Sequence, residues 1–182
     1  MTNTKLKQNE IKLKGKYLKE YNQIIEPIIS NIEFQKRKEF VHHENESVYE
    51  HSLRVSVLSY KIAKKIKVDY KSAAIGGLLH DFYTTPWQED STPKPFFQKH
   101  GFTHAKDAHN NAKKYFSNII NPKIENIILR HMFPLNITPP KYIESWIVTI
   151  SDKIISSSVL MHPSQYTKYL GMKRSNKKWI KK

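Results

Sequence analysis

Hydrophobic residues recur along this chain at spacings of three and four, the period of an amphipathic α-helix, and strict alternation is rare. The first helical pattern covers residues 17–32, and Pro27 inside it is the expected position of a kink. A second begins after Ser47, which has the spacing of a capping box with Glu50. Its apolar stripe includes a histidine and consists of Val48, His51, Val55, Leu58 and Ile62. The pattern predicts an all-α fold of five or more helices with little or no sheet.

A third helical pattern follows Asp69, the expected N-cap, and ends at His80 and Asp81. Its small residues permit the close approach of a neighbouring helix and are Ala73, Ala74, Gly76 and Gly77. Residues 84–101 contain three prolines and are predicted to form a long loop, a length typical of lids and binding segments.

Three further helices are expected after this loop. The first covers residues 103–116 and carries His104 near its start, and the second is short and ends at His131. The last covers residues 143–161, where a carboxylate shares one side with apolar residues: Val148, Asp152, Ile155 and Val159. Polar side chains with metal-binding chemistry therefore recur at apolar faces and helix ends.

The length of 182 residues, of which 38% are hydrophobic, fits one domain, with a core at about residues 40–162 and basic extensions at both ends. The chain has no apolar stretch of membrane-spanning length and no signal-peptide pattern, so we expect a cytoplasmic protein without a membrane partner. The absence of cysteine excludes disulfides, thiolate nucleophiles and cysteine-ligated zinc. Any metal must then be held by His, Asp or Glu.

The formal net charge of +15 favours an anionic partner, either a phosphorylated metabolite or a nucleic acid. Much of the excess lies in the two ends of the chain, where lysines crowd. This distribution describes long-range steering more than it describes an active site.

Four polar residues lie on apolar helix faces or at a helix end, at positions that should be buried: His51, His80, Asp81 and Asp152. Taken singly, a buried histidine is more often a hydrogen-bonded core residue, and Asp152 could pair with a nearby cation. Together they indicate a metal site, because burying two carboxylates without cationic partners or a metal costs several kcal/mol. Helical bundles build metal sites from such residues on facing helices.

This order of His, His-Asp and a distant Asp resembles the HD-domain superfamily of metal-dependent phosphohydrolases. The similarity extends from Val48 to Leu160 through the segments "YEHSLRVS", "GGLLHDF", "GFTHAKDA", "ILRHMFPL" and "VTISDK". It implies a helical bundle around a metal site in which the four residues bind one metal ion. Members with two metals carry extra histidines, a role that falls here to His104 and His131, with Asp81 bridging both ions. The resemblance favours Fe or Mn, and the ligand types would also accept Zn, Co or Ni.

The expected reaction is hydrolysis of a phosphate ester on a small anionic, nucleotide-like substrate by a metal-activated hydroxide. Asp81 and Lys153 are the candidate catalytic residues, and Arg54 and Arg130 are candidates for substrate binding. One alternative is a mixed-valence di-iron oxygenase, because some proteins of the same superfamily use this ligand pattern to activate dioxygen. A second is a basic nucleic-acid-binding module, which would not need buried carboxylates. The substrate and the oligomeric state remain open.

Overall fold

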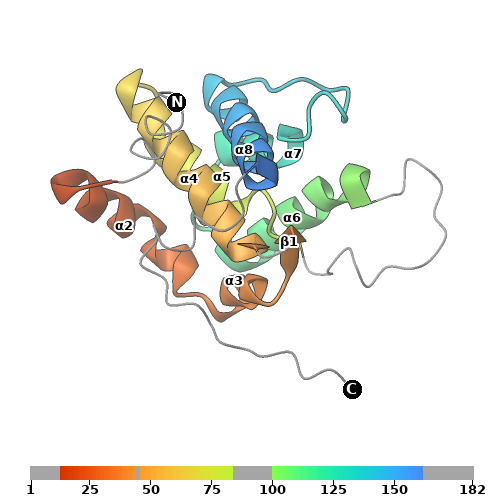
Figure 1. Cartoon of the computed structure of the whole chain (residues 1–182), viewed down its shortest axis with the longest axis horizontal. Coiled ribbons are helices and arrows are strands. Elements are labelled where there is room, and N and C mark those ends of the chain that lie inside the picture. Colours follow the sequence, from red (N-terminus) through yellow and green to blue (C-terminus); the bar gives the residue numbers. More distant parts are fainter. Residues whose placement is uncertain (1–12, 44–45, 84–99, 162–182) are drawn as a thin grey trace.

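The computed structural model describes residues 13–43, 46–83 and 100–161, and within these ranges the chain is almost entirely helical (Figure 1). Its α-helices are α2 (Gly15–Ile29), α3 (Ile32–Gln35), α4 (Val48–Lys65), α5 (Tyr70–Leu79), α6 (His100–Phe116), α7 (Pro122–Arg130) and α8 (Ile143–Met161). A 3₁₀ turn, η1 (Lys36–Lys38), leads into two short antiparallel strands, β1 (Val41–His43) and β2 (Glu46–Ser47). The prediction of an all-α fold is confirmed.

Local capping explains where several helices begin. The Ser47 side chain accepts a hydrogen bond from the backbone N–H of Glu50, while the Glu50 carboxylate accepts from Ser47, which completes the predicted capping box of α4. Asp69 caps α5 as expected. At α7 the Asn121 side chain accepts from the first backbone N–H groups, next to Pro122.

Two boundaries differ from the sequence-based expectation. The first predicted helix, residues 17–32, is divided into α2 and α3, because Asn31 caps a new helix by accepting from the backbone N–H of Glu33. Pro27 lies inside α2. The predicted loop at 84–101 is shorter at its far end, since α6 starts at His100, and residues 84–99 lie outside the described ranges.

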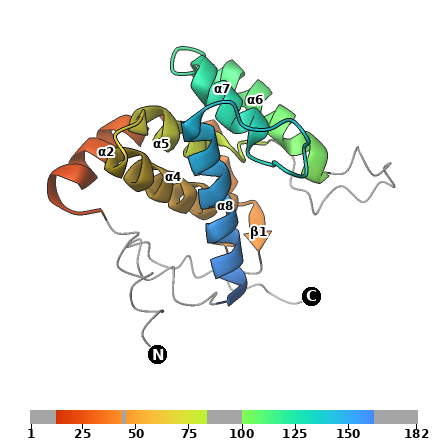
Figure 2. The same ribbon diagram turned by 90° about the horizontal axis from the view of Figure 1, so that it is seen from above.

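The α4–α5 pair forms the centre of the bundle, with α2 on one side and α6 on the other (Figures 1 and 2). α8 packs across α4, α5 and α7, and α6 packs on α7. The glycines of α5 allow this closeness, as predicted: a Cβ added at Gly77 would lie 2.9 Å from the Cα of Ser56 on α4. A Cβ added at Gly76 would lie 2.6 Å from side-chain atoms of Ile127 on α7. The packing sets the distance between the helices that carry the candidate ligands.

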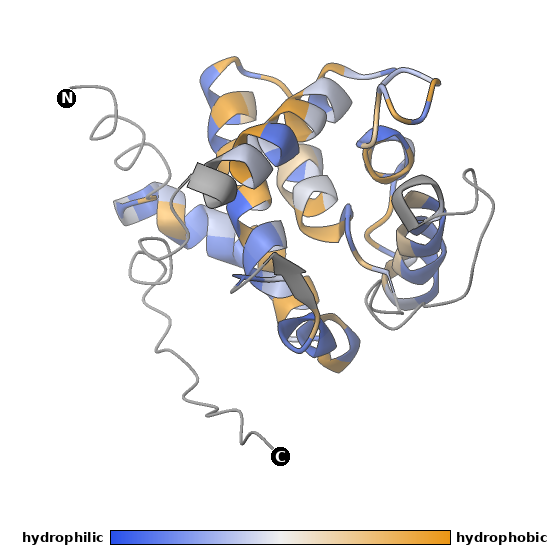
Figure 3. Cartoon of the chain, turned by 45° about the vertical axis from the view of Figure 1, so that its right-hand side comes forward, coloured by the Kyte–Doolittle hydropathy of each residue, from blue (hydrophilic) through white to orange (hydrophobic). Residues whose placement is uncertain are grey.

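Hydrophobic and hydrophilic residues are interspersed along the helices (Figure 3), as in amphipathic helices that turn one face to the core. The largest buried cluster joins α2, α4, α5, α6 and α7 and includes Ile28, Tyr60, Leu78, Phe116 and Ile128. Among the described helices none has the length and hydropathy needed to cross a bilayer.

Candidate metal centre

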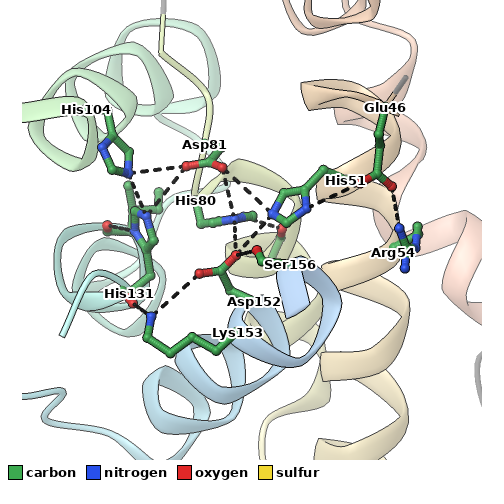
Figure 4. Close-up of polar contacts among 12 residues, drawn as sticks. Glu46, His51, Arg54, His80, Asp81, His104, His131, Asp152, Lys153 and Ser156 are labelled. Carbon is green, nitrogen blue, oxygen red and sulfur yellow. Dashed lines mark hydrogen bonds and ion pairs between the residues drawn. The ribbon is translucent and has the colours of Figure 1, made fainter. Parts of the chain in front are cut away.

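Five helices carry the six predicted ligands or end next to them, and the side chains meet at one place in the interior (Figure 4). His51 lies in the first turn of α4, His104 near the start of α6, and Asp152 in the middle of α8. His80 and Asp81 follow the last residue of α5, and His131 follows the last residue of α7. All six side chains are buried, with exposed fractions between 0% for His51 and His80 and 9% for Asp152.

One group of ligand atoms gathers His51, His80, Asp81 and Asp152. The Nε2 atom of His51 lies 3.0 Å from Oδ1 of Asp152 and 3.9 Å from Oδ2 of Asp81. The Nε2 atom of His80 lies 3.4 Å from Oδ2 of Asp81 and 3.6 Å from Oδ1 of Asp152. Two imidazoles and two carboxylates therefore face a common point.

The second group meets the other oxygen of Asp81. The Nε2 atoms of His104 and His131 lie 3.0 Å apart, and each lies 3.5 Å from Oδ1 of Asp81. Asp81 thus directs Oδ2 toward the first group and Oδ1 toward the second (Figure 4). A single carboxylate placed in this way can bridge two cations.

The separations of the ligand atoms fit metal coordination. Donor atoms that each lie about 2.1 Å from one ion are about 3.0–3.4 Å from one another. His51, His80 and Asp81 offer atoms that all lie within 4.8 Å of one another, and so do Asp81, His104 and His131. Nε2 of His80 is buried and has no hydrogen-bond partner, which an ion at the centre of the first group would supply.

Backbone carbonyls fix two of the imidazole rings. Nδ1 of His80 lies 2.9 Å from the carbonyl oxygen of Gly77, and Nδ1 of His131 lies 2.7 Å from that of Ile128. A nitrogen that faces a carbonyl must carry the proton, so Nε2 is left to face the ligand cluster. The helix ends therefore set both the orientation and the tautomer of these rings.

The charges in the first group are strongly coupled. Burial alone would lower the pKa of His80, but the neighbouring carboxylates of Asp81 and Asp152 outweigh it and raise that pKa to about 9. Burial alone would raise the pKa of Asp152, but the hydrogen bond from His51 and the nearby imidazole of His80 hold it well below its usual range. Without a metal, positive charge on His80 offsets the nearby carboxylates, and a bound cation would take over that role.

The three predicted cationic residues are placed differently. Lys153 is half-exposed at the edge of the cluster, where Nζ donates to the backbone carbonyl of His131 at 3.2 Å and lies 3.7 Å from Oδ2 of Asp152. Arg54 is buried and donates to Glu46 at 2.5 Å, on the side of His51 away from Asp81 (Figure 4). This placement does not support the expected contact of Arg54 with substrate. Arg130 is partly buried at the end of α7.

Several neighbours of the cluster were not anticipated from the sequence. Glu46 approaches His51, and Ser156 donates to Oδ1 of Asp152 at 3.3 Å. The ring of Tyr83 contacts the ring of His104 edge-on. The backbone carbonyl of Tyr83 accepts a hydrogen bond from the buried guanidinium of Arg37. Only the position of Ser156, one turn after Asp152 on the same helix, carried a signal in the sequence.

Comparison with family models gives one match, described as the HD domain, over residues 48–156. The matched segment contains all six predicted ligands. Neither the comparison with curated proteins nor that with solved structures returned a match.

Proposed function

The chain belongs to the HD-domain family, whose members are generally metal-dependent phosphohydrolases, and from this premise we propose that it hydrolyses phosphate esters at the buried His/Asp cluster. The observation that carries the proposal is the position of Asp81, with one oxygen toward each group of ligand atoms. A purely structural carboxylate would need one cationic partner, whereas Asp81 faces four imidazoles. The arrangement supports a site for two divalent ions.

In this proposal His51, His80, Asp81 and Asp152 hold one ion, and Asp81, His104 and His131 hold the second. Such ions supply Lewis-acid polarisation of phosphoryl oxygens and activate the attacking water near neutral pH. The nitrogen-rich ligand set with two carboxylates is suited to Fe or Mn and accepts Zn, Co or Ni.

The protein's own side chains give the site its order and charge. The backbone carbonyls behind His80 and His131 keep their Nε2 atoms directed inward before any ligand arrives, which lowers the cost of assembling the site. Lys153 lies where Asp152 approaches the surface, so its ammonium can bind a phosphate oxygen and offset the charge that develops during transfer. The substrate we propose is a small phosphorylated, nucleotide-like molecule.

The test is an anaerobic assay of the Mn²⁺- or Zn²⁺-loaded protein against nucleotides and model phosphodiesters. We expect phosphate release or phosphodiester cleavage, and we expect Asp81→Asn to abolish it. His109→Ala is the matched control, since His109 lies on α6 near Glu125 and outside the ligand cluster. An inactive panel together with substrate-dependent oxygen uptake by the iron-loaded protein would overturn hydrolysis in favour of oxygenase chemistry.

A further inference from the structure

The Nδ1 atom of His51 faces a different kind of group from those of His80 and His131. Behind His80 and His131, Nδ1 faces a backbone carbonyl three residues earlier in the chain. Behind His51, Nδ1 faces a side-chain carboxylate, with Oε2 of Glu46 at 3.9 Å. The Nε2 atom of the same ring points to Asp152 at 3.0 Å (Figure 4). Glu46 and Asp152 therefore lie at opposite nitrogens of one ring.

Glu46 is held on several sides. Its Oε1 atom accepts from Nη1 of Arg54 at 2.5 Å, and the side chain of Arg54 is 2% exposed. Its backbone pairs with that of His43 in the β1–β2 ladder. The next residue, Ser47, is fixed by the capping box of α4. A carboxylate constrained in this way can hold a neighbouring ring in place.

The chemistry of the position matches what a metal-binding imidazole needs. A carboxylate at the nitrogen remote from the ion keeps the proton on that nitrogen, orients the ring and makes the coordinating nitrogen more basic. At 3.9 Å the interaction of Glu46 with His51 is electrostatic, because a direct hydrogen bond is shorter than about 3.2 Å. Arg54 neutralises much of the charge of Glu46, so the carboxylate does not compete with the ligand cluster for a cation.

We propose that Glu46, clamped by Arg54, is a positioning residue that holds His51 with Nε2 directed at the metal centre. The inference rests on the proposed function, because it assumes that the cluster binds an ion. It also gives buried Arg54 a role: it fixes Glu46 rather than contacting substrate.

The test measures affinity for Mn²⁺ alone, from the electron paramagnetic resonance signal of the free ion. Glu46→Gln should weaken the binding of the ion that depends on His51 by about 10- to 100-fold. Glu50→Gln is the matched control: Glu50 is also at the start of α4, but its carboxylate serves the capping box. A merely structural role would lower thermal stability in Glu46→Gln and leave Mn²⁺ affinity within twofold of wild type, which would overturn the proposal.

A second variant covers the case in which Glu46→Gln does not fold, as judged by circular dichroism. Glu46→Asp keeps the charge that pairs with Arg54 and withdraws the carboxylate from His51, so it should also weaken Mn²⁺ binding. Unchanged affinity in Glu46→Asp would count against the proposal. A protein that binds Mn²⁺ with the expected dependence on Glu46 but cleaves no phosphate ester would refute the proposed hydrolysis and leave the role of Glu46 standing.

Discussion

Asp81 is the residue on which both halves of the cluster depend. Within the described part of the chain, Asp81 is the one residue that belongs to both sets of candidate ligands. It can serve both because it follows the end of α5, where the side chain leaves the helix toward α6 and α7. Loss of its charge should therefore affect two ions, whereas loss of a histidine should affect one.

The double variant His104→Ala/His131→Ala should reduce the number of bound ions without emptying the first group. Those imidazoles lie 3.5 Å from Oδ1 of Asp81, while His51 and His80 face Oδ2. Elemental analysis of protein loaded with Mn²⁺ should show about half of the wild-type metal content, and activity should fall steeply. Asp81→Asn should lose most of both ions. Equal metal content in the double variant and the wild type would show that these histidines are not ligands.

The candidate ligands could be predicted from the sequence because each is a polar residue at a position that helical spacing marks as buried. His51 and Asp152 lie on apolar stripes, and both are buried. Glu46 could not be found in this way. It precedes the helix, and its approach to His51 depends on how Arg54 and the short β1–β2 ladder fold back on the start of α4.

At the scale of the helix, the residue at which each helix begins was easier to predict from the sequence than the contacts between helices. The caps formed by Ser47 and Asp69 involve residues three apart, so the sequence contains both partners. The division between α2 and α3 was missed, since the apolar period continues across Asn31. Long-range contacts such as that of Glu20 on α2 with Tyr60 on α4 depend on helix packing that no local pattern specifies.

Glu20 on α2 accepts hydrogen bonds from residues of α4 and α5. This carboxylate should make the stability of the fold depend on pH in the acid range. The ammonium of Lys64 first, then the hydroxyls of Tyr60 and Tyr70, hold its pKa at about 2, below the usual 4.5. A lowered pKa contributes stability that is fully present above about pH 4.5 and is lost as the pH falls through about 2. The difference in free energy of unfolding between wild type and Glu20→Gln should therefore shrink over that interval.

Urea unfolding at a series of pH values measures this difference. Tyr70→Phe removes one of the three donors to Glu20, so its acid dependence should lie between those of wild type and Glu20→Gln. A wild-type advantage that stays constant from pH 5 to pH 2 would show that the folded protein does not lower the pKa of Glu20.

At the scale of the whole molecule, the cluster joins residues that are far apart in the chain. His51 and Asp152 are separated by 101 positions and come together only when α4 packs against α8. The unfolded chain cannot present these ligands at one point, so an ion that binds the cluster binds the folded state. The cluster takes side chains from α4, α5, α6, α7 and α8, so metal binding there should be coupled to the stability of the bundle.

Divalent metal should therefore raise the melting temperature. At an ion concentration 100 times the dissociation constant, linkage stabilises the folded state by about 2.7 kcal/mol. For a chain of 182 residues this corresponds to a rise of roughly 5–11 °C. Differential scanning calorimetry with and without Mn²⁺ measures the shift, and a chelator should reverse it. In Asp81→Asn the shift should largely disappear, whereas His109→Ala, changed outside the cluster, should retain it. An equal rise in Asp81→Asn would place the stabilising ion elsewhere on this basic protein.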